Sequence, residues 1–145
     1  MRRLVATGLV LAVALAGIAI AAAPRKGATY RGTIITGGAA ISWKVTATGK
    51  KVKQLAITNT PLFCEGGGAP VPLKFPAAAI SKKGRFTTTA TRKITEGPSA
   101  GKPQVEVTIN GRFAKGGKAT GTLKADWFGP ATDCDGKTTF TAATG

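Results

Sequence analysis

Residues 104–113 read Gln-Val-Glu-Val-Thr-Ile-Asn-Gly-Arg-Phe, and the first six positions alternate between polar and apolar side chains. Successive side chains of a strand point to opposite faces, so the alternation places Val105, Val107 and Ile109 together on one buried face. Ile41, Trp43 and Val45 alternate with polar residues in the same way. Both stretches predict half-buried antiparallel strands, with Trp43 in the core.

Further short apolar runs are separated by Gly-Lys turns, at the spacing of an all-β fold. The additional strands are expected at 30–35, 55–57, 78–81, 86–91, 120–127 and 138–143. No helical periodicity with caps follows residue 23. The pattern predicts an antiparallel β-sandwich of about eight or nine strands, with a β-barrel as the alternative.

The N-terminus has the pattern of a secretory signal peptide. Arg2 and Arg3 precede an apolar run over 4–23, which ends in several Ala-x-Ala-like cleavage sites before Pro24. We therefore expect a signal peptide over 1–23 and one secreted domain over 24–145, with no stable membrane insertion after cleavage. The alternative is an uncleaved membrane anchor, because about 20 apolar residues can span a bilayer.

The two cysteines, Cys64 and Cys134, both lie in the part of the chain expected to be exported. An isolated pair in an oxidising compartment predicts a disulfide. The segment 65–76, directly after Cys64, contains three consecutive glycines and three prolines, which predicts a long surface loop.

Three phrases and the late Cys134 carry a resemblance to known proteins. The phrases are Ile-Ser-Lys-Lys-Gly-Arg-Phe at 80–86, Val-Thr-Ile-Asn-Gly-Arg-Phe at 107–113 and Ala-Thr-Gly-Thr-Leu at 119–123. Together they resemble small secreted β-sandwich domains of unknown function common in actinobacteria and their relatives. The resemblance implies export and a β-sandwich, and it implies no catalytic residues.

The absence of histidine excludes Ser-His-Asp and Cys-His catalysis and every imidazole metal site. We expect no enzyme activity and no catalytic, cofactor-binding or metal-binding residues. Asp133, Asp135 and Gly136 are similar to the middle of a calcium loop, but Ala131 and Ala142 stand where the first and last ligands belong. No calcium loop is therefore predicted.

A glycine-rich stretch at 111–118 superficially resembles a phosphate-binding loop. Gly117 stands where that motif requires lysine, and the context is strand-turn-strand. Nucleotide binding is not expected.

The net charge of +15 falls to +13 when a leader containing Arg2 and Arg3 is removed. Such a charge attracts polyanions, and the extracellular candidates are anionic envelope polymers, acidic polysaccharide and DNA. The candidate polyanion-binding residues are Lys50, Lys51, Lys82, Lys83, Arg85, Lys115 and Lys118. The alternative is that these side chains solvate turns and guard strand edges. A binding patch requires the turns to converge on one end of the fold, which alternate hairpins would achieve only in part.

Trp127 and Phe128 are neighbours on a predicted strand, so one of them should face outward and offer a surface on which a sugar could stack. Two functions are expected from these observations. The first is a non-catalytic, secreted or envelope-associated binding module. The alternative is a secreted enzyme or enzyme inhibitor that acts through the 65–76 loop.

Overall fold

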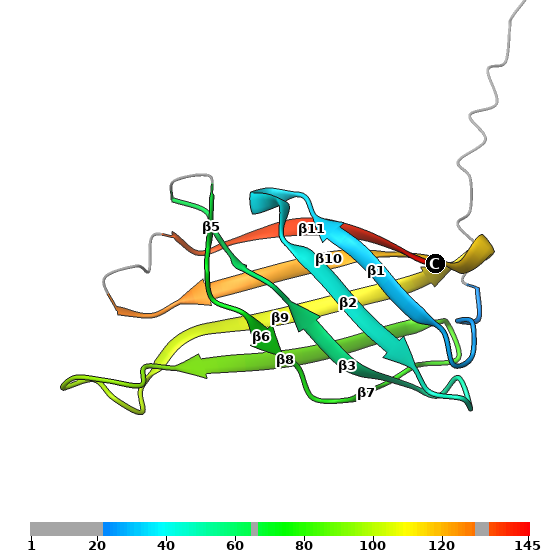
Figure 1. The fold of residues 1–145 in the computed structure, drawn as a ribbon, viewed down its shortest axis with the longest axis horizontal. Helices are drawn as coiled ribbons and strands as arrows, with labels where there is room; N and C mark the ends of the chain where they lie inside the picture. The colour runs from blue at the N-terminus through cyan, green and yellow to red at the C-terminus, as the bar shows by residue number, and fades with distance from the viewer. Residues whose placement is uncertain (1–21, 65–66, 130–133) are drawn as a thin grey trace, which may run out of the picture.

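The computed structural model describes residues 22–64, 67–129 and 134–145. These residues form antiparallel β-structure, which confirms the all-β prediction (Figure 1). The large sheet consists of β1 (Thr29–Ile34), β2 (Ala40–Val45), β3 (Lys51–Ile57), β6 (Leu73–Lys74), β7 (Ala78–Ala79), β8 (Arg85–Lys93), β9 (Pro103–Ala114), β10 (Lys118–Trp127) and β11 (Gly136–Thr144). The smaller elements are the β4 (Thr60–Leu62) and β5 (Gly67–Ala69) hairpin and the 3-10 turns η1 (Thr36–Gly38) and η2 (Lys115–Gly117).

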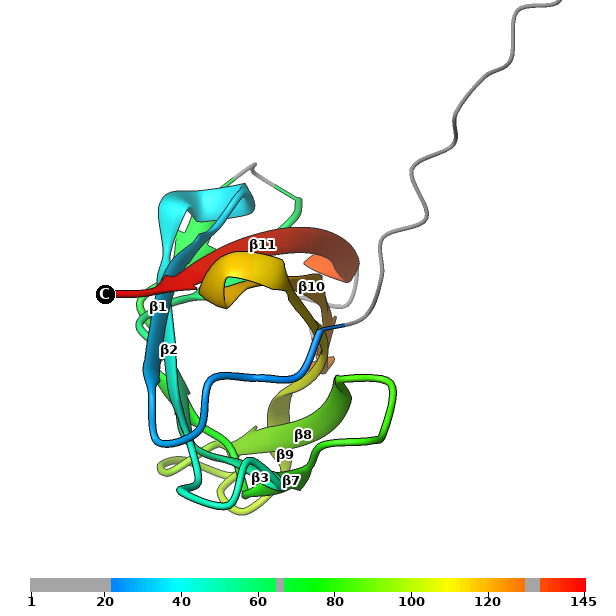
Figure 2. The ribbon, with the colours of Figure 1, turned by 90° about the vertical axis from the view of Figure 1, so that its right-hand side faces the viewer.

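The large sheet is nearly closed on itself. Its strand order is β6-β3-β2-β1-β11-β10-β9-β8, with β7 also paired to β3, so the last strand returns toward the first (Figure 2). The Thr88 hydroxyl on β8 donates to the carbonyl of Pro76, between β6 and β7, at 3.1 Å across the remaining gap. This arrangement fits both expected descriptions, the sandwich and the barrel.

The strand facing β8 across this gap is broken by proline. β6 pairs with the end of β3 near Ile57, and β7 pairs with its beginning near Lys51. Pro76 lies between these two strands and has no N–H to donate, which prevents a continuous ladder. Phe75 keeps the segment attached, because its N–H donates to the Leu55 carbonyl at 2.9 Å.

The interior is filled by aromatic and branched side chains. Tyr30 and Trp43 stack with ring centroids 5.3 Å apart, and Phe113 meets Tyr30 edge-on at 5.1 Å. The rings of Phe86 and Phe140 contact Trp43 from further sides. Trp43 is 1% exposed, which confirms its predicted place in the core.

Gly111 is required in the middle of β9 because a ring occupies the position of its missing side chain. A Cβ atom on Gly111 would lie 2.2 Å from Cζ of Phe86 on the neighbouring strand. The Asn-Gly-Arg-Phe phrase is therefore a core feature of a strand. It leaves room for the end of the Phe86 ring against the backbone of the neighbouring strand.

The β2–β3 ladder contains an irregularity at Gln54. Lys44 pairs with Lys53 and Ser42 pairs with Ala56, so β3 has one more residue than β2 between these two pairs. Gln54 adopts φ 54°, a left-handed conformation that costs a residue with a side chain about 1–2 kcal/mol. The bulge keeps Val52, Leu55 and Ile57 buried on both sides of the irregularity.

The predicted disulfide is present between Cys64 and Cys134. It joins the residues after β4 to those before β11, and the Phe63 N–H donates to the Cys134 carbonyl at 3.2 Å. The predicted signal peptide over 1–23 lies outside the described residues, except for Ala22 and Ala23.

Candidate functional site

The basic turns converge on one end of the sheet. The connections β2–β3, β7–β8 and β9–β10 all lie at the right-hand end in Figure 1, which faces the viewer in Figure 2. Every basic residue singled out from the sequence is exposed in these turns or in the first residues of the following strands. We call this surface the basic end; its residues are Lys50, Lys51, Lys82, Lys83, Arg85, Lys115 and Lys118, together with Arg25 and Lys26.

The segment 22–28 crosses the same end of the sheet before β1 begins (Figure 2). The Ala22 N–H donates to the Phe113 carbonyl at 3.4 Å, and the Gly27 N–H donates to the Thr46 carbonyl at 3.1 Å. Between them, the Arg25 N–H donates to the Tyr30 hydroxyl at 3.1 Å. These bonds place Arg25 and Lys26 beside the predicted turn lysines.

Gly84 allows this segment to approach the β7–β8 turn. It has φ +65°, and a Cβ atom there would lie 2.5 Å from the Ala22 carbonyl oxygen. The Gly84 carbonyl in turn accepts from the Phe113 N–H at 2.9 Å. The glycine therefore serves both the turn and the docking of the N-terminal segment.

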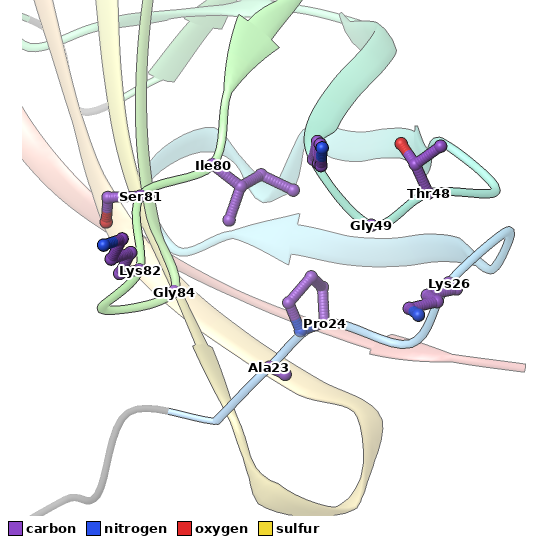
Figure 3. A pocket seen from close by; sticks show the side chains of 10 residues that line it. Ala23, Pro24, Lys26, Thr48, Gly49, Ile80, Ser81, Lys82 and Gly84 are labelled. Carbon is purple, nitrogen blue, oxygen red and sulfur yellow. The ribbon is translucent and has the colours of Figure 1, made fainter.

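An open depression of about 510 Å³ lies between the N-terminal segment and two of the turns (Figure 3). Pro24 and Ile80 form apolar walls, and Lys26 and Lys82 stand on opposite sides of it. Lys50 from the β2–β3 turn also lines it. Three lysines from separate segments therefore border a depression with apolar walls, an arrangement that suits an anionic group attached to a carbon skeleton.

Two hydroxyl groups of this depression already have partners within the turns. The Ser81 hydroxyl accepts from the Arg85 N–H at 3.1 Å, and the Thr48 hydroxyl lies 3.2 Å from that of Thr46. These bonds shape the turns that present Lys50 and Lys82. The lysine ammonium groups therefore provide the charge, and the hydroxyl groups fix the local backbone.

Acidic side chains of the described residues lie toward the opposite end. Glu96 is in the β8–β9 connection and Asp135 directly precedes β11. Glu106 and Asp126 are opposite each other near the far ends of β9 and β10. The described acids are therefore segregated from the basic end, while exposed lysines such as Lys93 and Lys102 accompany them at the far end.

The acids at the far end are engaged by neighbouring side chains. Lys124 Nζ lies 2.7 Å from Asp126 Oδ1, and the Thr91 hydroxyl donates to Glu106 at 3.3 Å. The hydrogen bond to Asp126 and the charge of that carboxylate raise the pKa of Lys124. Asp135 accepts a hydrogen bond from the Trp127 N–H.

The predicted aromatic pair divides as expected, because only one of the two faces outward. Trp127 is 5% exposed and its indole N–H donates to the Pro61 carbonyl at 3.0 Å. Phe128 is 42% exposed. Phe128 is therefore the ring of the pair that faces outward, and Trp127 belongs to the core.

The segment 65–76 differs from the predicted surface loop. Glu65 and Gly66 lie outside the described residues, while Gly67–Ala69 forms β5 against β4. Val71, Leu73 and Phe75 are buried, and the Thr60 hydroxyl donates to the Val71 carbonyl at 2.8 Å. Alternate apolar side chains therefore bury 71–75 against the core, so this part of the segment is not the surface loop that was predicted.

The sequence analysis missed Pro24, Arg25 and Lys26 as parts of the site, because it treated them only as the residues that close the apolar run of the leader. The signal that could have found them is the string Pro-Arg-Lys-Gly at 24–27, which is polar enough to remain with the folded domain.

The described part of the chain contains neither a candidate metal site nor a helix that could span a membrane. Within 22–64, 67–129 and 134–145, no group of three or more acidic or cysteine side chains is arranged to hold a metal ion. No helix in the same ranges is long and apolar enough to cross a membrane.

No family model, no curated protein and no solved structure matches this chain. The resemblance to small secreted actinobacterial β-sandwich domains therefore stays a prediction.

Proposed function

We propose that this protein is a secreted or cell-envelope-associated, non-catalytic module that binds anionic envelope polymers through its basic end. The observation that supports it most is the segregation of charge. The exposed basic residues of three turns and of segment 22–28 share one end, and the described acids lie toward the other. Like charges held together repel one another, and a polyanion relieves that repulsion while it releases its own counterions.

The disulfide supports the proposed location, because such bonds persist in oxidising compartments. Location is tested by fractionating the cells that produce the protein and measuring its intact mass. We expect the protein in the medium or the envelope fraction, with Cys64 and Cys134 oxidised and the leader removed between residues 21 and 24. Recovery in the cytoplasm with free thiols would contradict the proposal.

Binding is tested with a matched pair of triple variants of the exported protein. The first neutralises the basic end (Lys50→Gln, Lys82→Gln, Lys115→Gln), and the second removes the same charge from exposed lysines of the far end (Lys93→Gln, Lys102→Gln, Lys137→Gln). Both are titrated with a polyol-phosphate polymer, a polyuronate and DNA at low salt and at about 0.15 M salt, where the Debye length is about 8 Å.

We expect the basic-end variant to lose binding to at least one polymer at physiological salt, and the far-end variant to retain it. Equal losses in the two variants would mean that only net charge matters, and no binding by the wild type at physiological salt would refute the proposed function.

A further inference from the structure

We infer that the basic end docks on the anionic lipid surface of the membrane across which the protein is exported, with phosphate headgroups as its ligand. The inference deepens the proposed function and rests on the same basic end. It names the membrane surface as the partner and fixes the orientation of the fold, with β4, β5 and the disulfide directed away from the bilayer.

The first argument is the position at which the apolar run joins the fold. The apolar run over 4–23 continues to the point where the chain is already bonded to the sheet, because the Ala22 N–H donates to the Phe113 carbonyl. No spacer separates the run from the basic end. While the run is in the bilayer, the basic end must therefore lie at the level of the headgroups.

The second argument is the shape of the charged surface. Its lysines come from three separate turns and from segment 22–28, which surround the rim of a nearly closed sheet and form an end face (Figure 2). A rim of separate cations can meet a planar array of phosphates at several points at once. The depression lined by Lys26, Lys50 and Lys82 provides one place where a headgroup can enter this face.

The third argument is electrostatic. A basic residue close to an anionic membrane contributes about a fivefold gain in affinity, and the effect decays within a Debye length. The described acids Glu96, Glu106, Asp126 and Asp135 lie toward the far end and so do not oppose this attraction at close range. Removal of the leader leaves Arg25, Lys26 and the turn lysines on the basic end, so the attraction to the membrane does not depend on the leader.

The test measures binding and orientation of the exported protein on vesicles. Vesicles of phosphatidylglycerol and phosphatidylcholine, at about 1:3, are compared with pure phosphatidylcholine by co-sedimentation at about 0.15 M salt. The basic-end triple variant (Lys50→Gln, Lys82→Gln, Lys115→Gln) should bind the anionic vesicles about 100-fold more weakly than the wild type. The far-end triple variant (Lys93→Gln, Lys102→Gln, Lys137→Gln) should bind within a few-fold of the wild type.

Orientation is read in the wild-type protein by acylation of its lysines, followed by mass spectrometry. Lys26, Lys50, Lys82 and Lys115 are all exposed, as are Lys93, Lys102 and Lys137, so each group serves as a reference for the other. Anionic vesicles should protect the first group and leave the second reactive. Equal protection of both groups, or protection of the second alone, overturns the inferred orientation.

The outcomes separate this inference from the proposed function. Binding to the soluble polymers without binding to anionic vesicles overturns the membrane inference and leaves the proposed function standing. Binding to vesicles alone supports the inference and refutes polymer binding. Binding to neither refutes both.

Discussion

Removal of the disulfide should weaken the fold mainly through the unfolded chain. Cys64 and Cys134 are 70 residues apart, and a cross-link over this separation stabilises a protein by about 4 kcal/mol in the chain-entropy treatment. In the folded state, two other bonds hold the same region, from the Phe63 N–H to the Cys134 carbonyl and from the Trp127 indole to the Pro61 carbonyl. The fold should therefore survive in Cys64→Ser/Cys134→Ser, with a free energy of unfolding lower by about 4 kcal/mol.

The assay is equilibrium unfolding in urea, followed by tryptophan fluorescence. Trp43 and Trp127 are both buried, so both report on loss of the core. The near-ultraviolet circular dichroism of the double variant should match that of the wild type before denaturant is added. A domain of this size has a free energy of unfolding of about 5–15 kcal/mol, so the midpoint should move markedly. A difference below about 1 kcal/mol, with both proteins folded, would refute the chain-entropy reasoning.

Three further changes test local features. Gln54→Gly should stabilise the fold by up to about 1 kcal/mol, because glycine adopts the left-handed conformation without strain, whereas Gln54→Val should destabilise the fold. Thermal unfolding that shifts both variants in the same direction from the wild type would contradict this. In the full-length chain, which retains Ala22, Gly84→Ala should release segment 22–28 because its Cβ meets the Ala22 carbonyl. The release is measured as faster proteolysis after Arg25, and unchanged cleavage would count against the contact. The pairing with Asp126 raises the pKa of Lys124, so it stabilises the folded state below about pH 10.4, and this stabilisation is lost as the pH rises through the raised pKa. The free energy of unfolding of Lys124→Met should therefore fall less steeply at alkaline pH than that of the wild type.

The strands could be predicted from the sequence because burial on one face of a sheet leaves a period of two. Val105, Val107 and Ile109 are all fully buried, and so is Val45 with its predicted partners on β2. The disulfide could be predicted because the chain contains one pair of cysteines and no other pairing exists.

Features that depend on how the strands are arranged in space could not be predicted from this alternation of buried and exposed residues. The glycines and prolines of 65–76 indicated a loop, but Val71, Leu73 and Phe75 alternate with exposed residues and bury their side chains against the sheet. A strand interrupted by proline keeps the alternation of buried and exposed side chains, but it loses the continuous ladder of backbone hydrogen bonds. The Gln54 bulge could not be predicted for a different reason. Glutamine rarely adopts a positive φ, so its presence in the sequence does not indicate a bulge.

The basic turns converge because an even number of strands separates each of them from the next. The sequence did not show this number. In an up-and-down sheet, every second connection lies at the same end. The β2–β3 and β9–β10 turns satisfy this rule directly, but several predicted connections separate them. Because β6 and β7 together take the place of one strand and the β4–β5 hairpin leaves the sheet and returns, the β7–β8 turn also falls at that end. Insertion of one more full strand before β8 would reverse its direction and carry Lys82 and Lys83 to the far end. The gathering of basic turns at one end is therefore a consequence of the path of residues 58–79. The basic end depends on this segment, although the segment contributes no lysine to it.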